Sequence, residues 1–148
     1  QEERATAWRF VTYAYQSERA ACLKYANKVE AIAVRFPDHA VIQEERATVW
    51  EVTAYACRSD PATCLKYANK VEDIAARFPE HEKIQEELAF ACKHMTFAHR
   101  TNYEISSVYA RRAQNLAVRF PNNSNIQDQA RWADEYAALG LPSQNDLS

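Results

Sequence analysis

The chain has 148 residues, 47% hydrophobic and 26% charged, and this composition excludes a disordered protein. The formal net charge of −2 lacks the dense positive charge of nucleic-acid binding, and no apolar run approaches the roughly 20 residues of a membrane span. The single glycine, Gly140, disfavours a sheet rich in turns and favours helices joined by short loops. We therefore expect an all-α protein, with neither nucleic acid nor membrane as a partner.

A 42-residue unit is repeated along the chain. Residues 1–6 return unchanged as 43–48, and residues 22–30 return unchanged as 64–72. The triplet Arg-Phe-Pro ends at Pro37, Pro79 and Pro121. Such self-similarity is typical of repeat architectures. The predicted organisation is three units (1–42, 43–84 and 85–126), a closing helix (127–140) and a tail (141–148).

Each unit is predicted to hold two helices. In the middle unit, Asp38 is expected to cap a helix over 39–57. Ser59 or Asp60 is expected to cap the second helix, which has Pro61 in its first turn and ends before Pro79. At the end of the chain, Gly140 is expected to stop the last helix in a left-handed conformation.

The first helices are predicted to have three faces. A charged face, expected to meet water, holds Glu2, Arg9, Glu44, Glu51, Arg58, Glu86, Lys93 and Arg100. A second face, expected to be core, holds Ala7, Phe10, Ala14, Val49, Val52 and Ala56. The third is an apolar stripe of Trp8, Val11, Tyr15, Trp50, Thr53, Cys57, Cys92, Met95 and His99. So wide an apolar surface predicts contact between stacked units, as in a solenoid.

The chain resembles the tetratricopeptide-repeat superfamily in a longer variant. Ala26 and Ala33 match its two small residues seven apart, while Phe10, Tyr13 and Ala14 match its aromatic, large apolar and close-contact positions. The resemblance implies a right-handed superhelix of antiparallel helix pairs. HEAT and armadillo repeats have similar unit lengths and remain the alternative. The resemblance also implies a partner-binding groove lined by Trp8, Val11, Tyr15, Trp50, Thr53, Cys57, Met95 and His99.

The sequence predicts a protein- or peptide-binding scaffold, not an enzyme. It has no phosphate loop, nucleophile elbow or zinc motif, so we expect no cofactor and no metal. A weaker alternative is a soft-metal site at Cys57, Cys92 and His99. The four cysteines form no Cys-x-x-Cys pair, and free thiols favour a reducing, cytoplasmic location.

Two further hypotheses stay open at this point. In the first, the chain is a structural segment of a longer solenoid or a module that self-associates through an open N-terminal face. The second concerns an anionic partner. A row of basic residues on the second helices is a candidate site for an anionic partner, although such rows are usually solvated. The row consists of Lys24, Lys28, Lys66, Lys70 and Arg112.

Overall fold

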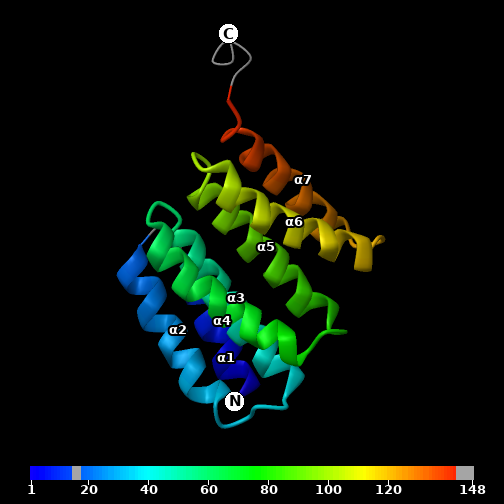
Figure 1. The fold of residues 1–148 in the computed structure, drawn as a ribbon. Coiled ribbons are helices and arrows are strands. Elements are labelled where there is room, and N and C mark those ends of the chain that lie inside the picture. The colour runs from blue at the N-terminus through cyan, green and yellow to red at the C-terminus, as the bar shows by residue number, and fades with distance from the viewer. Residues whose placement is uncertain (15–17, 143–148) are drawn as a thin grey trace.

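The computed structural model describes residues 1–14 and 18–142, which form seven helices and no strand (Figure 1). The helices are α1 (Glu2–Ala14), α2 (Arg19–Ala33), α3 (Ala40–Ala56), α4 (Pro61–Arg77), α5 (Glu82–Ala98), α6 (Tyr103–Arg119) and α7 (Ser124–Ala138). Three helix pairs follow one another from the N-terminal end, and α7 closes the array. The expected all-α, solenoid-like architecture is confirmed.

The helices lie in two layers. Each first helix (α1, α3, α5, α7) contacts the next first helix along the array. Each second helix (α2, α4, α6) contacts the first helices before and after it, whereas no two of the described second helices contact each other. The more closely spaced layer of a curved stack lies on its inner side, so the first helices form the inner layer.

Side chains at the helix starts explain most of the boundaries. Asp60 caps α4 by accepting a hydrogen bond from the backbone N–H of Thr63, and Pro61 occupies the first turn. Asn102 and Asn123 cap α6 and α7 in the same way. The expected cap at Asp38 is wrong: His39 occupies that position, and its side chain makes no capping bond.

Gly140 is required for a different reason from the expected one. Gly140 does not have a positive φ, so the predicted left-handed end of the last helix is wrong. A Cβ atom at Gly140 would instead lie 2.7 Å from the backbone nitrogen of Tyr103 and 3.1 Å from the carbonyl oxygen of Arg100. Close approach to the start of α6 therefore excludes a side chain here.

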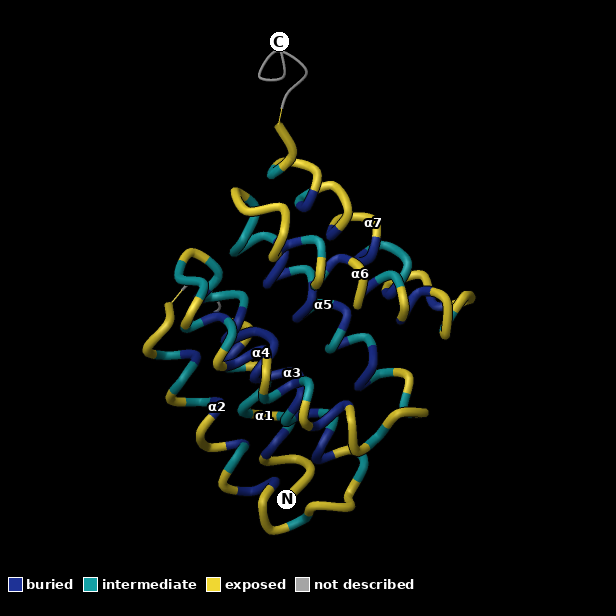
Figure 2. The backbone as a smooth tube through the Cα atoms, viewed as in Figure 1, coloured by how far each residue is buried: buried dark blue, intermediate teal, exposed yellow. Residues whose placement is uncertain are grey.

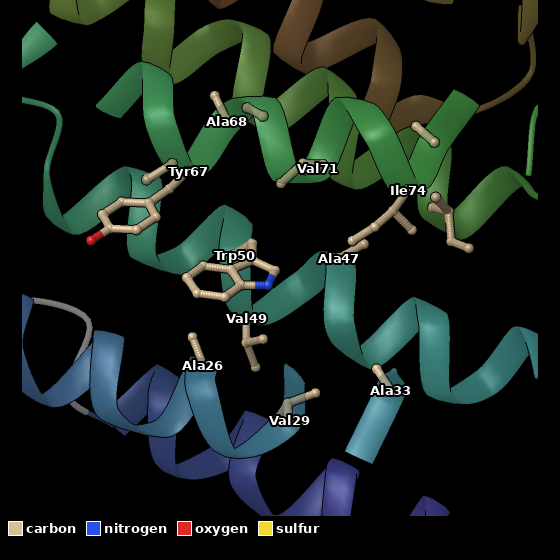
Figure 3. Packing of buried hydrophobic residues seen from close by; sticks show 14 of the residues in the cluster. Ala26, Val29, Ala33, Ala47, Val49, Trp50, Tyr67, Ala68, Val71 and Ile74 are labelled. Atoms are coloured by element: carbon tan, nitrogen blue, oxygen red, sulfur yellow. The ribbon is translucent and has the colours of Figure 1, made fainter. Parts of the chain in front are cut away.

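The largest core cluster extends across the unit boundaries. Figure 3 shows the Trp50 indole of α3 between α2 and α4, with Val29 on one side and Val71 on the other. Ala26 and Ala33 are fully buried, as expected of the two small residues, and Ala68 of α4 is buried as well. Ala14 is exposed and Ala56 half-buried, so the close-packing role expected there is not observed. Figure 2 shows the buried positions concentrated on the middle helices.

A buried glutamine joins each second helix to the first helix that follows it. The side-chain amide of Gln85 donates hydrogen bonds to the carbonyl oxygens of Ala75 and Phe78, both at 3.0 Å. Gln43 and Gln127 make the equivalent bonds to the ends of α2 and α6. These bonds satisfy carbonyl groups that a helix end leaves without partners.

Replacing Gln85 with alanine should lower the free energy of unfolding by about 1–3 kcal/mol, because two carbonyl groups at the end of α4 lose their donors in a buried site. Chemical denaturation followed by circular dichroism measures the change. Gln1→Ala is the matched control, since Gln1 occupies the same repeat position but is exposed. Equal stability of the two variants would contradict the role of the buried amide.

Candidate functional site

The stripe expected to line a groove lies inside the protein. Trp50 is only 1% exposed, and Thr53, Cys57 and Met95 are buried as well. Trp8, Val11 and His99 are half-buried, while Tyr15 lies outside the described residues. The four buried side chains offer no surface to a partner, so they do not line the expected groove.

The stripe faces the second helices. The Trp50 ring stacks on Tyr67 of α4 with a centroid distance of 5.5 Å, and Trp8 stacks on Tyr25 of α2 at 5.3 Å. His99 stacks on Tyr109 of α6 at 6.1 Å. Since α3 and α5 are each flanked by two second helices, their sideways apolar faces are covered.

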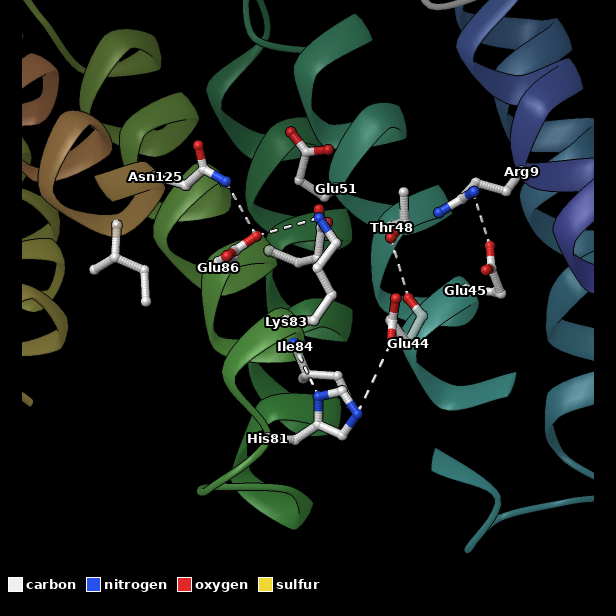
Figure 4. A network of polar contacts seen from close by, with 12 residues as sticks. Arg9, Glu44, Glu45, Thr48, Glu51, His81, Lys83, Ile84, Glu86 and Asn125 are labelled. Carbon is white, nitrogen blue, oxygen red and sulfur yellow. Dashed lines mark hydrogen bonds and ion pairs between the residues drawn. The ribbon is translucent and has the colours of Figure 1, made fainter. Parts of the chain in front are cut away.

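The charged face forms the seam between neighbouring first helices, so its expected exposure to water is wrong at the centre. Glu51 is only 6% exposed. At the first seam, Arg9 of α1 forms an ion pair with Glu45 of α3 at 2.9 Å, as Figure 4 shows. At the second seam, Glu51 of α3 lies 2.5 Å from Nε2 of His94 on α5. The seam buries these ionisable groups because the first helices pack directly against one another.

Exposed and half-buried aromatic residues lie on the inner surface of the first helices, in what we call the inner aromatic row. The row consists of Phe10, Tyr13, Tyr55, Phe90, Phe97, Trp132 and Tyr136. Phe10, expected in the core, is 60% exposed because no further first helix covers α1. Contacts link several of the rings: Phe97 packs edge-on against Tyr136 at 5.2 Å, and Trp132 stacks on Tyr136 at 6.0 Å.

Three cationic side chains lie over these rings in addition to Arg9, which lies over Phe10 at 4.7 Å and is paired with Glu45. The Arg58 guanidinium is 3.9 Å from the centroid of Tyr55, and the Arg100 guanidinium is 4.2 Å from that of Phe97. The Lys93 ammonium is 5.1 Å from the Phe90 centroid. Within the described part of the chain, none of the three forms an ion pair with a carboxylate. The inner surface therefore presents apolar rings with unneutralised positive charge.

A pocket of about 280 Å³ opens at the second seam, between α1, α3 and α5. Its lining consists of Tyr13, Glu51, Val52, Tyr55, Phe90, Lys93 and His94. The lining combines three rings of the inner aromatic row with Lys93 and the Glu51–His94 pair. The pocket has the size and the mixed character of a site for one side chain of a partner.

Burial controls the protonation of the groups beneath this pocket. It raises the pKa of Glu51 to about 8. Burial, followed by the neighbouring charge of Glu51, raises the pKa of Glu87 to about 8 as well. Burial also lowers the pKa of His94 well below its usual range, helped by the charges of Lys93 and Arg58. At neutral pH the imidazole is therefore uncharged and the two carboxyl groups retain a proton.

The thiols are buried, and several cations of the basic row have partners within the chain. All four cysteines are free and buried, and burial raises the pKa of Cys64 and Cys92 to about 12, which makes them weak nucleophiles. In the basic row, Lys28 lies over the Trp8 ring and Lys70 over the Trp50 ring. Arg112 pairs with Glu72 at 3.3 Å. Most of the row's charges are thus engaged within the chain.

Among the described residues, no three His, Cys, Asp or Glu side chains converge as metal ligands. None of the helices in that part of the chain combines the length and the apolar character needed to cross a bilayer.

Sequence reasoning missed the inner aromatic row, although a signal for it exists. Tyr13, Tyr55 and Phe97 are spaced by 42 residues, as are Phe90 and Trp132. The resemblance placed Phe10 and Tyr13 at helix-packing positions, so their exposure was not expected. Aromatic residues that recur at one repeat position, with no small residue to pack against, indicate an exposed row.

The geometry is thus an aromatic and cationic inner surface with a pocket over a buried carboxyl–imidazole cluster. Comparisons of the chain with protein-family models, with curated proteins and with solved structures found no match. The resemblance to tetratricopeptide repeats therefore remains a prediction, and function has to be argued from this surface.

Proposed function

We propose that the chain is a non-catalytic scaffold that binds a peptide segment of a partner protein on the inner surface of its first helices. The observation that carries this proposal is the inner aromatic row, whose rings lie beneath Arg58, Lys93 and Arg100. Tyr, Trp, Phe and Arg are the residues most enriched where proteins bind one another.

The chemistry of the surface favours a partner that carries both acidic and apolar side chains. Arg58 and Arg100 each donate one hydrogen bond to a backbone carbonyl of their own helix end, at 3.0 Å. Each guanidinium has further N–H groups, which match the oxygens of a carboxylate. The neighbouring rings offer apolar area to an aromatic or aliphatic side chain, and the 280 Å³ pocket accepts one such group.

A binding role is favoured over a catalytic one by the state of the reactive groups. The thiols are buried, and the buried carboxyl groups of Glu51 and Glu87 are partnered within the seam by His94 and Lys83. The free cysteines also support a reducing compartment such as the cytoplasm.

The test is a selection from a peptide library followed by calorimetric titration at low and high salt. Selected peptides should combine Asp or Glu with aromatic or aliphatic residues, and their affinity should fall as salt rises. The double variant Arg58→Gln/Arg100→Gln should bind at least about tenfold more weakly, because hydrogen bonds to charged groups contribute roughly 1.5–3 kcal/mol each.

The matched control is Lys24→Gln/Lys66→Gln, which removes the same charge from the second helices. It should leave affinity unchanged, and circular dichroism checks that both double variants fold. Selection of peptides without acidic residues, or equal binding by both double variants, would refute the proposal.

A further inference from the structure

The start of α1 carries the side chains with which α3 binds a preceding helix. We call Gln1, Arg4 and Trp8 the N-terminal docking set. Their counterparts 42 residues later are Gln43, Arg46 and Trp50, and all three residue types are identical. The function of the set can therefore be read from what its counterparts do in α3.

In α3 the three counterparts donate hydrogen bonds to the C-terminal part of α2. Arg46 donates two hydrogen bonds to the carboxylate of Glu30, at 2.8 and 2.7 Å. The indole N–H of Trp50 donates to the same carboxylate at 2.8 Å. Gln43 donates to the carbonyl oxygens of Ala33 and Phe36, both at 3.0 Å. A single glutamate and one helix end thus accept hydrogen bonds from all three side chains.

In α1 the tryptophan ring has the same local packing, but the docking set has no such partner among the described residues. The Trp8 ring stacks on Tyr25 with Lys28 over it at 4.9 Å, as the Trp50 ring stacks on Tyr67 with Lys70 over it at 4.7 Å. Gln1 and Arg4 are exposed, and none of the described residues accepts a hydrogen bond from Arg4 or from the Trp8 indole. A hollow of about 240 Å³ lies over Gln1, Arg4, Trp8 and Ile32.

We propose that the N-terminal docking set binds a helix with the chemistry of this chain's own second helices. The helix carries a glutamate at the position of Glu30, a small residue three positions later and free carbonyl groups at its end. Charge complementarity supports this occupant, since Arg4 needs a carboxylate and the Glu30 carboxylate is what its counterpart binds. The exposed polar donors exclude a purely apolar occupant.

The donor of this helix is not a second folded copy of the chain. In the structure, α2, α4 and α6 each contact first helices on both sides, so a folded copy has no second helix free to offer. The occupant is a helix from outside this folded array, and the surface is distinct from the inner aromatic row.

The first test uses a synthetic peptide of residues 18–37, which spans α2, added in reducing buffer to the intact chain. We expect a 1:1 complex by calorimetry, with a gain of helicity. The Glu30→Gln peptide should bind at least tenfold more weakly, and so should the Arg4→Gln chain with the original peptide. Arg131→Gln, which changes an exposed arginine on α7, should bind like the unmodified chain.

A second test uses a fusion protein, so that no free peptide has to fold. An additional copy of residues 1–42 is joined before Gln1, so that its α2 precedes the original α1 as α2 precedes α3. We expect a higher thermal midpoint than that of the original chain, and loss of most of this gain when Glu30 of the added copy is changed to glutamine. The proposal is overturned if the fusion is not stabilised or if both peptides bind equally well. Arg4-dependent dimerisation of the chain alone would also overturn it.

Discussion

Replacing Trp50 with alanine should lower the free energy of unfolding by about 3–5 kcal/mol, the range for deleting a large buried aromatic side chain. The indole is 1% exposed, stacks on Tyr67 and donates a hydrogen bond to Glu30. Its loss removes contacts to both α2 and α4 and leaves the buried side of Glu30 with fewer donors. Urea denaturation followed by circular dichroism measures the change.

Two further variants separate the contributions at this position. Trp50→Phe keeps most of the ring packing but removes the N–H donor, so it should cost about 1–3 kcal/mol. Trp8→Ala removes the same residue type from the same repeat position, where it is half-buried and has no glutamate partner among the described residues. It should cost roughly half as much as Trp50→Ala. Equal losses of unfolding free energy for Trp8→Ala and Trp50→Ala would mean that the contact of Trp50 with α2 contributes nothing to stability.

Stability should fall between pH 7 and pH 8 by about 1 kcal/mol for each buried carboxyl group that is still largely protonated at pH 7 in the native state and ionised in the unfolded chain. The pKa values of Glu51 and Glu87 are raised to about 8 by burial, whereas an unfolded chain ionises its glutamates near their ordinary values. The folded state therefore binds more protons in this window, and rising pH favours unfolding. His94 contributes little there, because its pKa is lowered in the fold and its unfolded pKa lies below pH 7.

The variant Glu51→Gln should weaken this pH dependence by half or more. The amide replaces the carboxyl group at His94, and Glu87 then ionises beside Lys83, which lies 3.4 Å away, without a facing carboxylate. Urea midpoints measured across pH 7–8 test this result. Glu135→Gln, at an exposed position on α7, should keep the slope of the unmodified chain. If the dependence of stability on pH is unchanged in Glu51→Gln, the carboxyl group of Glu51 does not retain a proton in the folded state.

The repeat made much of the fold predictable. Pro61 and Pro79 delimit α4 as expected, because a missing N–H is tolerated in a first turn and not inside a helix. Ala26 and Ala33, predicted as the small residues of a close-packed helix, are both fully buried. The candidate site was not predictable in this way. A helical wheel shows that Trp50 and Glu51 point in different directions, but it does not show which neighbour covers each direction.

The sequence by itself determined that this protein is helical, that its unit is 42 residues long and that the units stack, because these properties follow from local periodicity and internal identity. Only the tertiary structure decided which faces are covered. Glu51 was expected in water and is buried, because the inner helices pack on one another; Phe10 was expected in the core and is exposed, because α1 has a first helix on one side only. Burial depends on neighbours distant in the chain, and identical units at different places in a stack have different neighbours.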